Sequence, residues 1–352
     1  MNPQPALVLT NGHLRDINAK TCHGLLRGSD RFTVLAVIDG KHAGSDAGSV
    51  LDGQERGIPV YESVESFFRS PPKEEPRVLV VGVAFPGGKL PDSARGDIGD
   101  ALRRGLGVIS GLHQLIGDDE EFSQLAQQHG VDLVDIRRPP SVSDLSFWNG
   151  SIYQAKAKRV AVLGTDCAIG KRTTCRFLLE ACRTQGLATE MIYTGQTGWM
   201  QGYPHGLILD SLPNDFVSGE LERAVVACDR ELSPELILIE GQSALRNPSG
   251  PCGSELLLST AAHGAILQHA PGRTFFVDQD PFDHRLPSAE KEVALILAYG
   301  VPVLAVTLHE EGMEPEALEG YRAHLEDKLG LPVVRPLVEG VGRILPTLRA
   351  LL

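Results

Sequence analysis

Residues 160–174 read VAVLGTDCAIGKRTT, and this stretch decides the fold of the second half of the chain. The apolar run from Val160 to Leu163 is typical of a buried strand, and a helical pattern follows from Lys171 to Gln185. A polar loop with glycines at Gly164 and Gly170 joins them. In such a unit, backbone N–H groups converge on an anion at the helix N-terminus, where the helix dipole also favours negative charge. The stretch therefore predicts a phosphate-binding loop.

This loop departs from the common G-x-x-x-x-G-K-[ST] motif in two respects. Five residues separate Gly164 from Gly170 where the common motif has four, and Arg172 follows Lys171 where Ser or Thr is usual. The spacing and the Gly-Thr-Asp opening resemble the loop of dethiobiotin synthetase, and the Thr-Thr pair after Arg172 resembles Mur ligases. The alternative interpretation is a glycine-rich turn with an exposed lysine. The residues predicted to bind the phosphates of coenzyme A or a nucleotide are Gly164, Thr165, Asp166, Cys167, Ala168, Ile169, Gly170, Lys171, Arg172, Thr173 and Thr174.

Two acidic residues are candidates for the catalytic base. Glu240 ends the buried run Leu236–Ile239, and ligands of open α/β sheets bind outside the carboxyl ends of the strands. Asp215 precedes a helical stretch, where it either caps the helix or handles a substrate ammonium group. If a magnesium nucleotide is bound, Thr173 and Glu240 are the expected metal ligands. The alternative for Glu240 is a carboxylate that caps a loop or pairs with an arginine.

Four further residues are candidate substrate ligands. Gln196 and Thr197 lie in the small, polar sequence TGQTG that follows an expected strand, and Gln242 lies two residues after Glu240. Neutral amides and hydroxyls supply hydrogen bonds to a ligand that approaches the backbone closely. Arg273 follows Pro-Gly and is suited to hold a carboxylate or phosphate through two parallel hydrogen bonds. A tight polar turn and a surface arginine are the respective alternatives.

Length and composition restrict the class of protein. The 352 residues indicate two domains, and 42% apolar residues are enough for buried cores. A formal net charge of -12 excludes a broad surface for nucleic-acid backbones, although one cleft can have the opposite sign. The six cysteines are scattered without a C-x-x-C pair, which is typical of a reducing cytoplasm. The apolar runs are strand-sized and no signal sequence is recognisable, so neither a membrane nor a secreted protein is expected.

The first half of the chain shows the same alternation of strands and helices. Continuous β-branched runs at 33–38 and 78–84 are typical of a parallel sheet that is covered on both faces. A helix is expected from about Asp119 to Gln128, with Gly130 as its stop. No G-x-G-x-x-G follows the first strand, so Asp39 at the end of the second strand has no dinucleotide loop to cooperate with.

The join between the two halves is expected near residues 138–158, where Pro139-Pro140 and turn-prone residues interrupt regular structure. We therefore expect two tandem, doubly wound, mostly parallel α/β sheets. Residues 1–150 are expected to form a Rossmann-like domain without the dinucleotide fingerprint, and residues 151–352 a P-loop NTPase-like domain. Further strands are expected at Thr189–Tyr193, Leu207–Leu209, Leu236–Ile239, Ala265–Leu267, Thr274–Val277 and Val303–Thr307.

Short motifs along nearly the whole chain together resemble those of a known two-domain family. They are Ala19-Lys20-Thr21, Gly24-Leu25-Leu26, Gly111-Leu112-His113, Asp135-Ile136-Arg137, Gly164 to Thr174, Thr194 to Gly198, Asp215 to Gly219 and Glu240-Gly241-Gln242. The family has a Rossmann-like N-terminal domain and a P-loop C-terminal domain, and it includes D-glutamate N-acetyltransferases. The resemblance implies acetyl-CoA as donor, the amino group of an acidic D-amino acid as acceptor, and a pathway link to an enolase-superfamily enzyme. We expect a cytoplasmic homo-oligomer that acts on a small molecule.

The chain also departs from the family pattern. Arg172 stands where Met is more usual, Ser243 replaces the second glycine of a Glu-Gly-Gln-Gly run, and Asn247-Pro248 stands where His-Pro is common. If that segment lines the acceptor site, the acceptor need not be D-glutamate.

Two other activities remain open at this point. One is an ATP-dependent kinase or ligase that acts on a small carboxylate or amine with Mg²⁺, and the other is a nucleotide-sensing protein without turnover. Under either enzymatic hypothesis, Lys171→Ala is expected to abolish ligand binding with little loss of stability, because an exposed loop lysine contributes little to the core.

Overall fold

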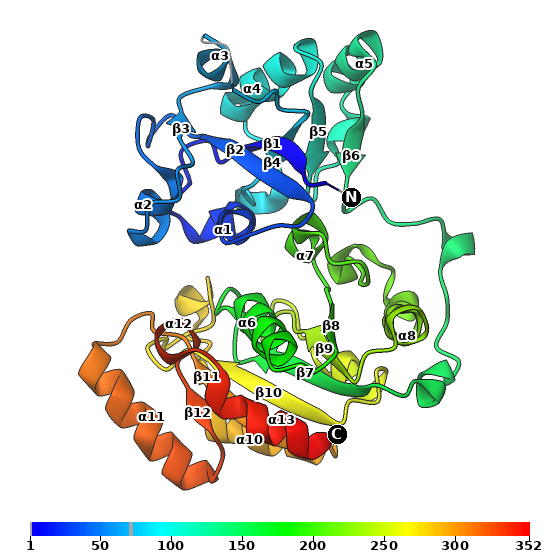
Figure 1. Ribbon diagram of the computed structural model, residues 1–352, viewed down its shortest axis with the longest axis vertical. Helices are drawn as coiled ribbons and strands as arrows, with labels where there is room; N and C mark the ends of the chain where they lie inside the picture. Colours follow the sequence, from blue (N-terminus) through cyan, green and yellow to red (C-terminus); the bar gives the residue numbers. More distant parts are fainter. Residues whose placement is uncertain (1, 70–72) are drawn as a thin grey trace. The chain divides into compact units, whose positions relative to one another are not determined.

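The computed structural model describes residues 2–69 and 73–352, which fold into two units (Figure 1). The first unit contains the chain up to Pro140 together with Gln196–Pro204, and the second contains Ser141–Gly195 and His205–Leu352. The division after Pro140 falls within the stretch 138–158 in which the sequence places the join. The segment Gln196–Pro204 lies in the second half of the sequence but folds with the first unit.

The first unit is built on a six-stranded parallel sheet with the order β3-β2-β1-β4-β5-β6. This is the strand order of Rossmann sheets, and it confirms the Rossmann-like fold. The strands are β1 (Gln4–Leu9), β2 (Phe32–Ile38), β3 (Val60–Tyr61), β4 (Val78–Val81), β5 (Gly107–Ser110) and β6 (Leu133–Asp135).

An apolar core lies on each face of this sheet. One face is covered by α3 (Val64–Phe67), α4 (Asp92–Arg103) and α5 (Glu120–His129). The other is covered by α1 (Lys20–Leu26), α2 (Ala47–Asp52) and the inserted α7 (Gln196–Gln201). The predicted helix after Asp119 is confirmed, because the Asp119 side chain accepts a hydrogen bond from Phe122 N and Gly130 ends the helix in a left-handed conformation.

The second unit is built on a six-stranded parallel sheet with the order β12-β11-β10-β7-β9-β8, so two tandem α/β sheets are confirmed. Its strands are β7 (Lys158–Gly164), β8 (Thr189–Ile192), β9 (Leu236–Glu240), β10 (Gly264–His269), β11 (Val303–Leu308) and β12 (Val333–Val334).

Two predicted strands of the second unit are wrong. Leu209 begins a 3-10 turn, and Thr274–Val277 forms only one isolated bridge, between Phe275 and Arg285. Both segments are apolar because Leu207 and Phe276 are buried. The first lies beside the end of β8, where Tyr193 and Gly206 form one isolated parallel bridge, but the pairing does not extend into a strand.

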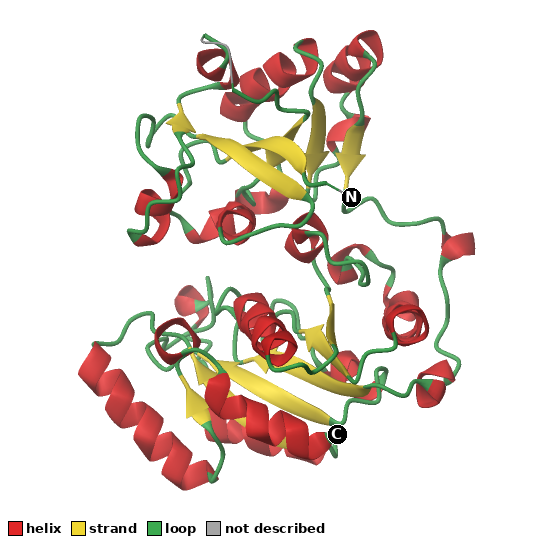
Figure 2. Cartoon of the chain, viewed as in Figure 1, coloured by secondary structure: helices red, strands yellow, loops and turns green. Residues whose placement is uncertain are grey.

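Helices cover both faces of the second sheet (Figure 2). On one face, α8 (Asn214–Leu232), α9 (Ser254–Leu258), α10 (Ala289–Ala298) and α11 (Pro315–Leu329) share one core with the strands. On the other, α6 (Lys171–Thr184) packs on β7, β8 and β9, and on α13 (Leu345–Leu351). The short α12 (Pro336–Glu339) follows β12. Within residues 2–69 and 73–352, no helix combines the length and the apolarity that a bilayer span requires.

Candidate phosphate-binding site

The predicted phosphate loop lies at the point where the strand order of the second sheet reverses. Strand β7 has β10 on one side and β9 on the other, and the loop leaves its carboxyl end at Gly164. Open α/β sheets bind their ligands at this position. A side chain at Gly164 would crowd Lys171, since a Cβ atom there would lie 2.8 Å from Lys171 Cδ. Any other residue at this position would therefore push the Lys171 side chain aside.

The loop presents backbone amides to an anion. Ala168 and Gly170 have positive φ angles of 53° and 97°, which turn the chain just before α6. Within the part of the chain that the structure describes, the amides of Ala168, Ile169 and Gly170 make no hydrogen bond. Helix α6 has no side-chain cap and no acidic residue in its first turn. Amides, dipole and cationic side chains thus make this helix start an anion site.

Lys171 is buried, contrary to the exposed position expected from the sequence. Its side chain folds back over the loop, where Nζ donates to the carbonyl oxygens of Asp166 at 2.6 Å and Ser243 at 2.8 Å. The ammonium group therefore links the phosphate loop to the segment that follows β9. Because these bonds hold a buried charge, the expectation that Lys171 contributes little to stability is corrected as well.

Asp166 braces the loop from inside. Its Oδ1 accepts from Cys167 N at 2.7 Å and from Asn247 Nδ2 at 3.3 Å, and its Oδ2 accepts from Arg273 NH1 at 3.0 Å and from Val277 N at 2.9 Å. The side chain is fully buried. Both oxygens are thus committed to protein donors, which favours a structural role for Asp166 over direct contact with a ligand.

Arg273 lies at the loop, as a site residue should, but its donors are engaged there. It donates to Asp166 and to Cys167 O at 2.9 Å, and it pairs with Glu311 on its other edge at 2.6 Å. These contacts favour a brace for the loop over a carboxylate ligand.

The three threonines of the loop differ in their surroundings. Thr165 Oγ1 lies 3.1 Å from Nδ1 of His269, and burial lowers the pKa of that histidine to about 4, so it is neutral. Thr174 Oγ1 donates to Gln268 Oε1 at 2.6 Å inside the protein. Thr173 is partly exposed, and its hydroxyl makes no hydrogen bond with the described residues. Thr173 is therefore the threonine with a hydroxyl that a ligand can use.

Glu240 pairs with an arginine, which is the alternative that the sequence left open for it. Its Oε1 lies 3.8 Å from Arg172 NH1, and its Oε2 accepts from Thr194 N at 3.2 Å. The carboxylate is buried. The carboxylate thus has a guanidinium on one side and a backbone N–H on the other. This environment favours a positioning role for Glu240.

The expected magnesium ligands, Thr173 and Glu240, lie beside a cationic side chain. A guanidinium has no lone pair for a metal, and Arg172 occupies the sequence position where the common motif supplies a hydroxyl ligand. Glu240 already faces that cation. Among the described residues, no group of three or more His, Cys, Asp or Glu side chains could hold a metal ion.

The other predicted site residues divide between the two units. Gln242 lies in the second unit, where its Nε2 donates to the carbonyl of Thr194, the residue that also contacts Glu240. Gln196 and Thr197 are buried in α7 of the first unit. There, Arg137 donates to Gln196 Oε1 at 3.2 Å, and the hydroxyls of Thr197 and Thr21 lie 2.8 Å apart. These contacts hold α7 in its own unit.

Asp215 lies in the first turn of α8, two residues after Pro213 at the N-cap position, and its side chain is exposed. It is therefore not the cap itself. No contact between Asp215 and the phosphate loop occurs within the described ranges. Its role as a base stays a prediction.

Sequence reasoning missed the part played by residues 243–247 and by Gln268. Ser243 has a φ of 43°, a conformation that glycine adopts more readily than serine, and its carbonyl receives the Lys171 ammonium. Asn247 is buried against Asp166, so it supports the loop. Gln268 accepts from Thr174 and Thr307, and its polar side chain within the apolar run of β10 was the available signal.

Asp39, at the end of β2 in the first unit, forms hydrogen bonds within the protein. Asp39 accepts hydrogen bonds from Thr10 Oγ1 at 2.6 Å, from Leu14 N at 2.9 Å and from His42 N at 3.2 Å. Burial alone would raise the pKa of Asp39, but these hydrogen bonds outweigh it and lower the pKa. Asp39 therefore braces the loop after β1.

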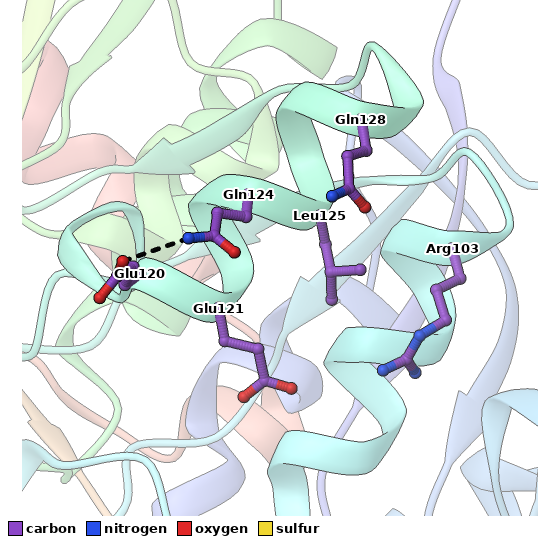
Figure 3. Close-up of a pocket in the computed structure, with 6 residues that line it drawn as sticks. All are labelled: Arg103, Glu120, Glu121, Gln124, Leu125 and Gln128. Atoms are coloured by element: carbon purple, nitrogen blue, oxygen red, sulfur yellow. Dashed lines mark hydrogen bonds between the residues drawn. The ribbon is translucent and has the colours of Figure 1, made fainter.

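A separate hollow of about 410 Å³ lies at α4 and α5 of the first unit (Figure 3). Its lining is polar apart from one leucine, and a hydrogen bond of 3.2 Å joins Gln124 to Glu120. None of the predicted site residues lines it; the lining residues are Arg103, Glu120, Glu121, Gln124, Leu125 and Gln128.

The fold and loop define a protein with a Rossmann-like domain followed by a P-loop domain, and comparison with known families agrees. Residues 40–139 match the model of the Rossmann-like domain DUF1611_N, and residues 146–345 match that of the P-loop domain DUF1611, a domain of unknown function. The chain belongs to the DUF1611 family. A DUF1611 family protein from Anabaena variabilis has a crystal structure with a TM-score of 0.88 and 28% identity, and the match covers 99% of each chain.

Two curated relatives of this chain are named D-glutamate N-acetyltransferase. The protein from Tritonibacter scottomollicae is 30% identical over 281 residues, which are 78% of this chain and 81% of the relative. The protein from a Pseudoalteromonas species is 29% identical over 284 residues, which are 77% of this chain and 81% of the relative. The resemblance inferred from the motifs is thereby confirmed, and these relatives support an acetyltransferase function.

Proposed function

We propose that this protein is an N-acetyltransferase that transfers the acetyl group of acetyl-CoA to the amino group of an acidic D-amino acid, with D-glutamate as the first candidate. The names of the two relatives support the reaction. At 29% and 30% identity the acceptor can differ from that of the relatives.

The observation that carries the donor assignment is the start of α6. The unbonded amides of Ala168, Ile169 and Gly170 lie beside Lys171 and Arg172 at a helix N-terminus that has no cap and no acid. This arrangement suits the phosphates of coenzyme A.

The reaction needs no nucleotide hydrolysis. The acceptor ammonium first loses a proton, and the amine nitrogen then attacks the thioester carbonyl carbon. A C–N bond forms and the C–S bond breaks. The nitrogen gives up its second proton, and the leaving thiolate takes up one proton to become the free thiol. Backbone N–H groups directed at the carbonyl oxygen would stabilise the tetrahedral oxyanion. The guanidinium of Arg172 lies 3.8 Å from Glu240, the carboxylate expected to hold Mg²⁺, and this gives less support to an ATP-dependent kinase or ligase.

The test is an assay of thiol release from acetyl-CoA with D- and L-glutamate, D- and L-aspartate and neutral D-amino acids, with mass spectrometry of the acetylated product. We expect release with an acidic D-amino acid and much less with its L-enantiomer. Lys171→Ala should weaken coenzyme A binding by about tenfold or more, because a cation beside the loop is lost, and it should also lower the stability of the second unit, because Nζ holds the carbonyls of Asp166 and Ser243.

The matched control is Lys328→Ala, which removes a lysine that pairs with Glu290 on the surface of α11. This variant should behave like the unmodified protein. Thiol release that stays at background with every acceptor would refute the proposed function, as would ADP formation that depends on Mg²⁺ and an acceptor.

A further inference from the structure

The first turn of α6 carries a charge pattern that is unfavourable for the helix on its own. Helix N-termini favour acidic residues, but this turn contains Lys171 and Arg172 and no acid. The nearest compensation is Glu240 at the end of β9, whose Oε1 lies 3.8 Å from Arg172 NH1. The excess positive charge is therefore built into the site.

Arg172 also occupies the position at which the common motif has its metal-binding hydroxyl. In the common motif the residue after the lysine is Ser or Thr, and its hydroxyl holds the magnesium ion that accompanies the phosphates. An arginine side chain at this position brings a permanent positive charge and several N–H donors instead. The pair with Glu240 places this charge beside the acid that would otherwise face the metal.

The remaining hydroxyls do not restore a metal site. Thr174 Oγ1 donates to Gln268 Oε1 at 2.6 Å, and the same oxygen accepts from Thr307 at 2.5 Å, so the Thr174 hydroxyl is directed into the protein. Thr173 would be a lone hydroxyl ligand beside a guanidinium that repels a divalent cation.

We infer that Arg172 takes the place of the magnesium ion, so that the loop binds a diphosphate without a divalent cation, and that Glu240 positions the Arg172 guanidinium. The inference rests on the proposed function only in that a diphosphate ligand occupies the loop. Its ligand class is a metal-free diphosphate such as that of coenzyme A. A nucleotide complexed with Mg²⁺ binds less well, because its metal meets the guanidinium.

The test is calorimetry with two probes, coenzyme A and ADP, each in EDTA and in excess Mg²⁺. For the unmodified protein we expect the same coenzyme A affinity in both buffers and a weaker ADP affinity in Mg²⁺. Arg172→Thr restores the common motif, and in EDTA it should weaken both probes by about tenfold or more. Excess Mg²⁺ should recover its ADP binding. Arg172→Lys keeps a charge, so its binding should stay independent of Mg²⁺.

Two further variants test whether the effects are specific to Arg172 and its partner Glu240 or follow from the loss of any arginine on α6. Arg183→Thr removes an arginine near the other end of α6, where it pairs with Glu190 at 2.6 Å, and it should leave both affinities unchanged. Glu240→Gln removes the partner of Arg172 and should weaken binding by the same factor with and without Mg²⁺. If Glu240 were a metal ligand, Glu240→Gln would instead weaken binding only in the buffer with Mg²⁺.

The inference is overturned if coenzyme A binding to the unmodified protein disappears in EDTA, if Arg172→Thr binds as tightly in EDTA as the unmodified protein, or if neither probe binds in either buffer. The proposed function can fail separately. Tight, metal-independent coenzyme A binding with no acetyl transfer to any acceptor would refute the function and leave the inference standing.

Discussion

Replacement of Asp166 by alanine should lower the free energy of unfolding of the second unit. The carboxylate is fully buried, and each of its two oxygens accepts two hydrogen bonds. The four donors belong to four different residues. Removal of one partner of a buried ion pair costs about 3–5 kcal/mol. Arg273 keeps its second partner, Glu311, so we expect about 3 kcal/mol, at the lower end of that range.

Asparagine should not rescue this position. Whichever way its amide is oriented, an NH₂ group replaces an oxygen that faces two donors, so two N–H groups lose their acceptor and meet another donor. Asp166→Asn should therefore destabilise by about 2 kcal/mol or more.

The two tryptophans allow this effect to be measured in the second unit alone. Trp148 lies in the second unit, where its Nε1 donates to Ser259 O at 3.1 Å, and Trp199 lies in α7 of the first. In a Trp199→Phe background, urea unfolding followed by fluorescence reports on Trp148. The control is Asp327→Ala, which removes an exposed aspartate from α11 and should change the unfolding free energy by no more than about 0.5 kcal/mol.

The reasoning fails if Asp166→Ala and Asp327→Ala have equal effects on the Trp148 transition. It also fails if Asp166→Ala abolishes coenzyme A binding while the unfolding free energy of the second unit is unchanged, because Asp166 would then act on the ligand and not on the loop.

Three further predictions concern other positions. Gly241→Ala should destabilise the second unit by about 1–3 kcal/mol, because the new Cβ would lie 2.2 Å from Val162 O, whereas Gly250→Ala, with 3.8 Å to its nearest neighbour, should be close to neutral in the same urea assay. Burial lowers the pKa of His269 from 6.5 to about 4, so as the pH falls the unfolded chain takes up this proton before the folded chain does. The contribution of His269 to stability is therefore full above about pH 6.5 and decreases towards pH 4. His269→Gln should reduce this pH dependence of the unfolding free energy but not abolish it, since His263 has a similarly lowered pKa. A double-mutant cycle of Thr21→Val and Thr197→Val should show a coupling of about 1 kcal/mol in the free energy of unfolding of the first unit. A coupling near zero would show that the hydrogen bond between the two hydroxyls does not hold α7 in place.

The fold and the phosphate loop were predictable because their signals are local. Val160 to Leu163, the glycines at 164 and 170 and the helix from Lys171 lie within one short stretch. The different roles of the loop side chains were not predictable, because they depend on partners outside the loop. Asp166 turns inward because Val277 N and Arg273 reach it, and Thr174 turns inward because Gln268 does. These partners lie far away in the sequence, so the loop residues appeared equivalent.

The position of α7 was hidden for a similar reason. Its sequence, QTGWMQ, reads as a polar ligand loop, but five of its six residues are buried. Their partners are Thr21, Gly24, Gly28 and Arg31 near the start of the chain. Buried polar side chains are hydrogen-bonded within the protein, and no pattern inside residues 196–204 indicates which segment supplies the bonds.

The same helix limits how such proteins can recombine. A gene fusion at residue 140 between two family members would pair the α7 of one parent with the α1 of the other, although the two halves would seem to be exchanged cleanly. Gln201 would then meet foreign carbonyls in place of those of Gly24 and Gly28. Arg31, which lies 3.9 Å from the centre of the Trp199 ring, would meet the side chain that the other parent has at that position. Residues 196–204 must therefore be inherited together with the N-terminal parent for a hybrid of this kind to fold.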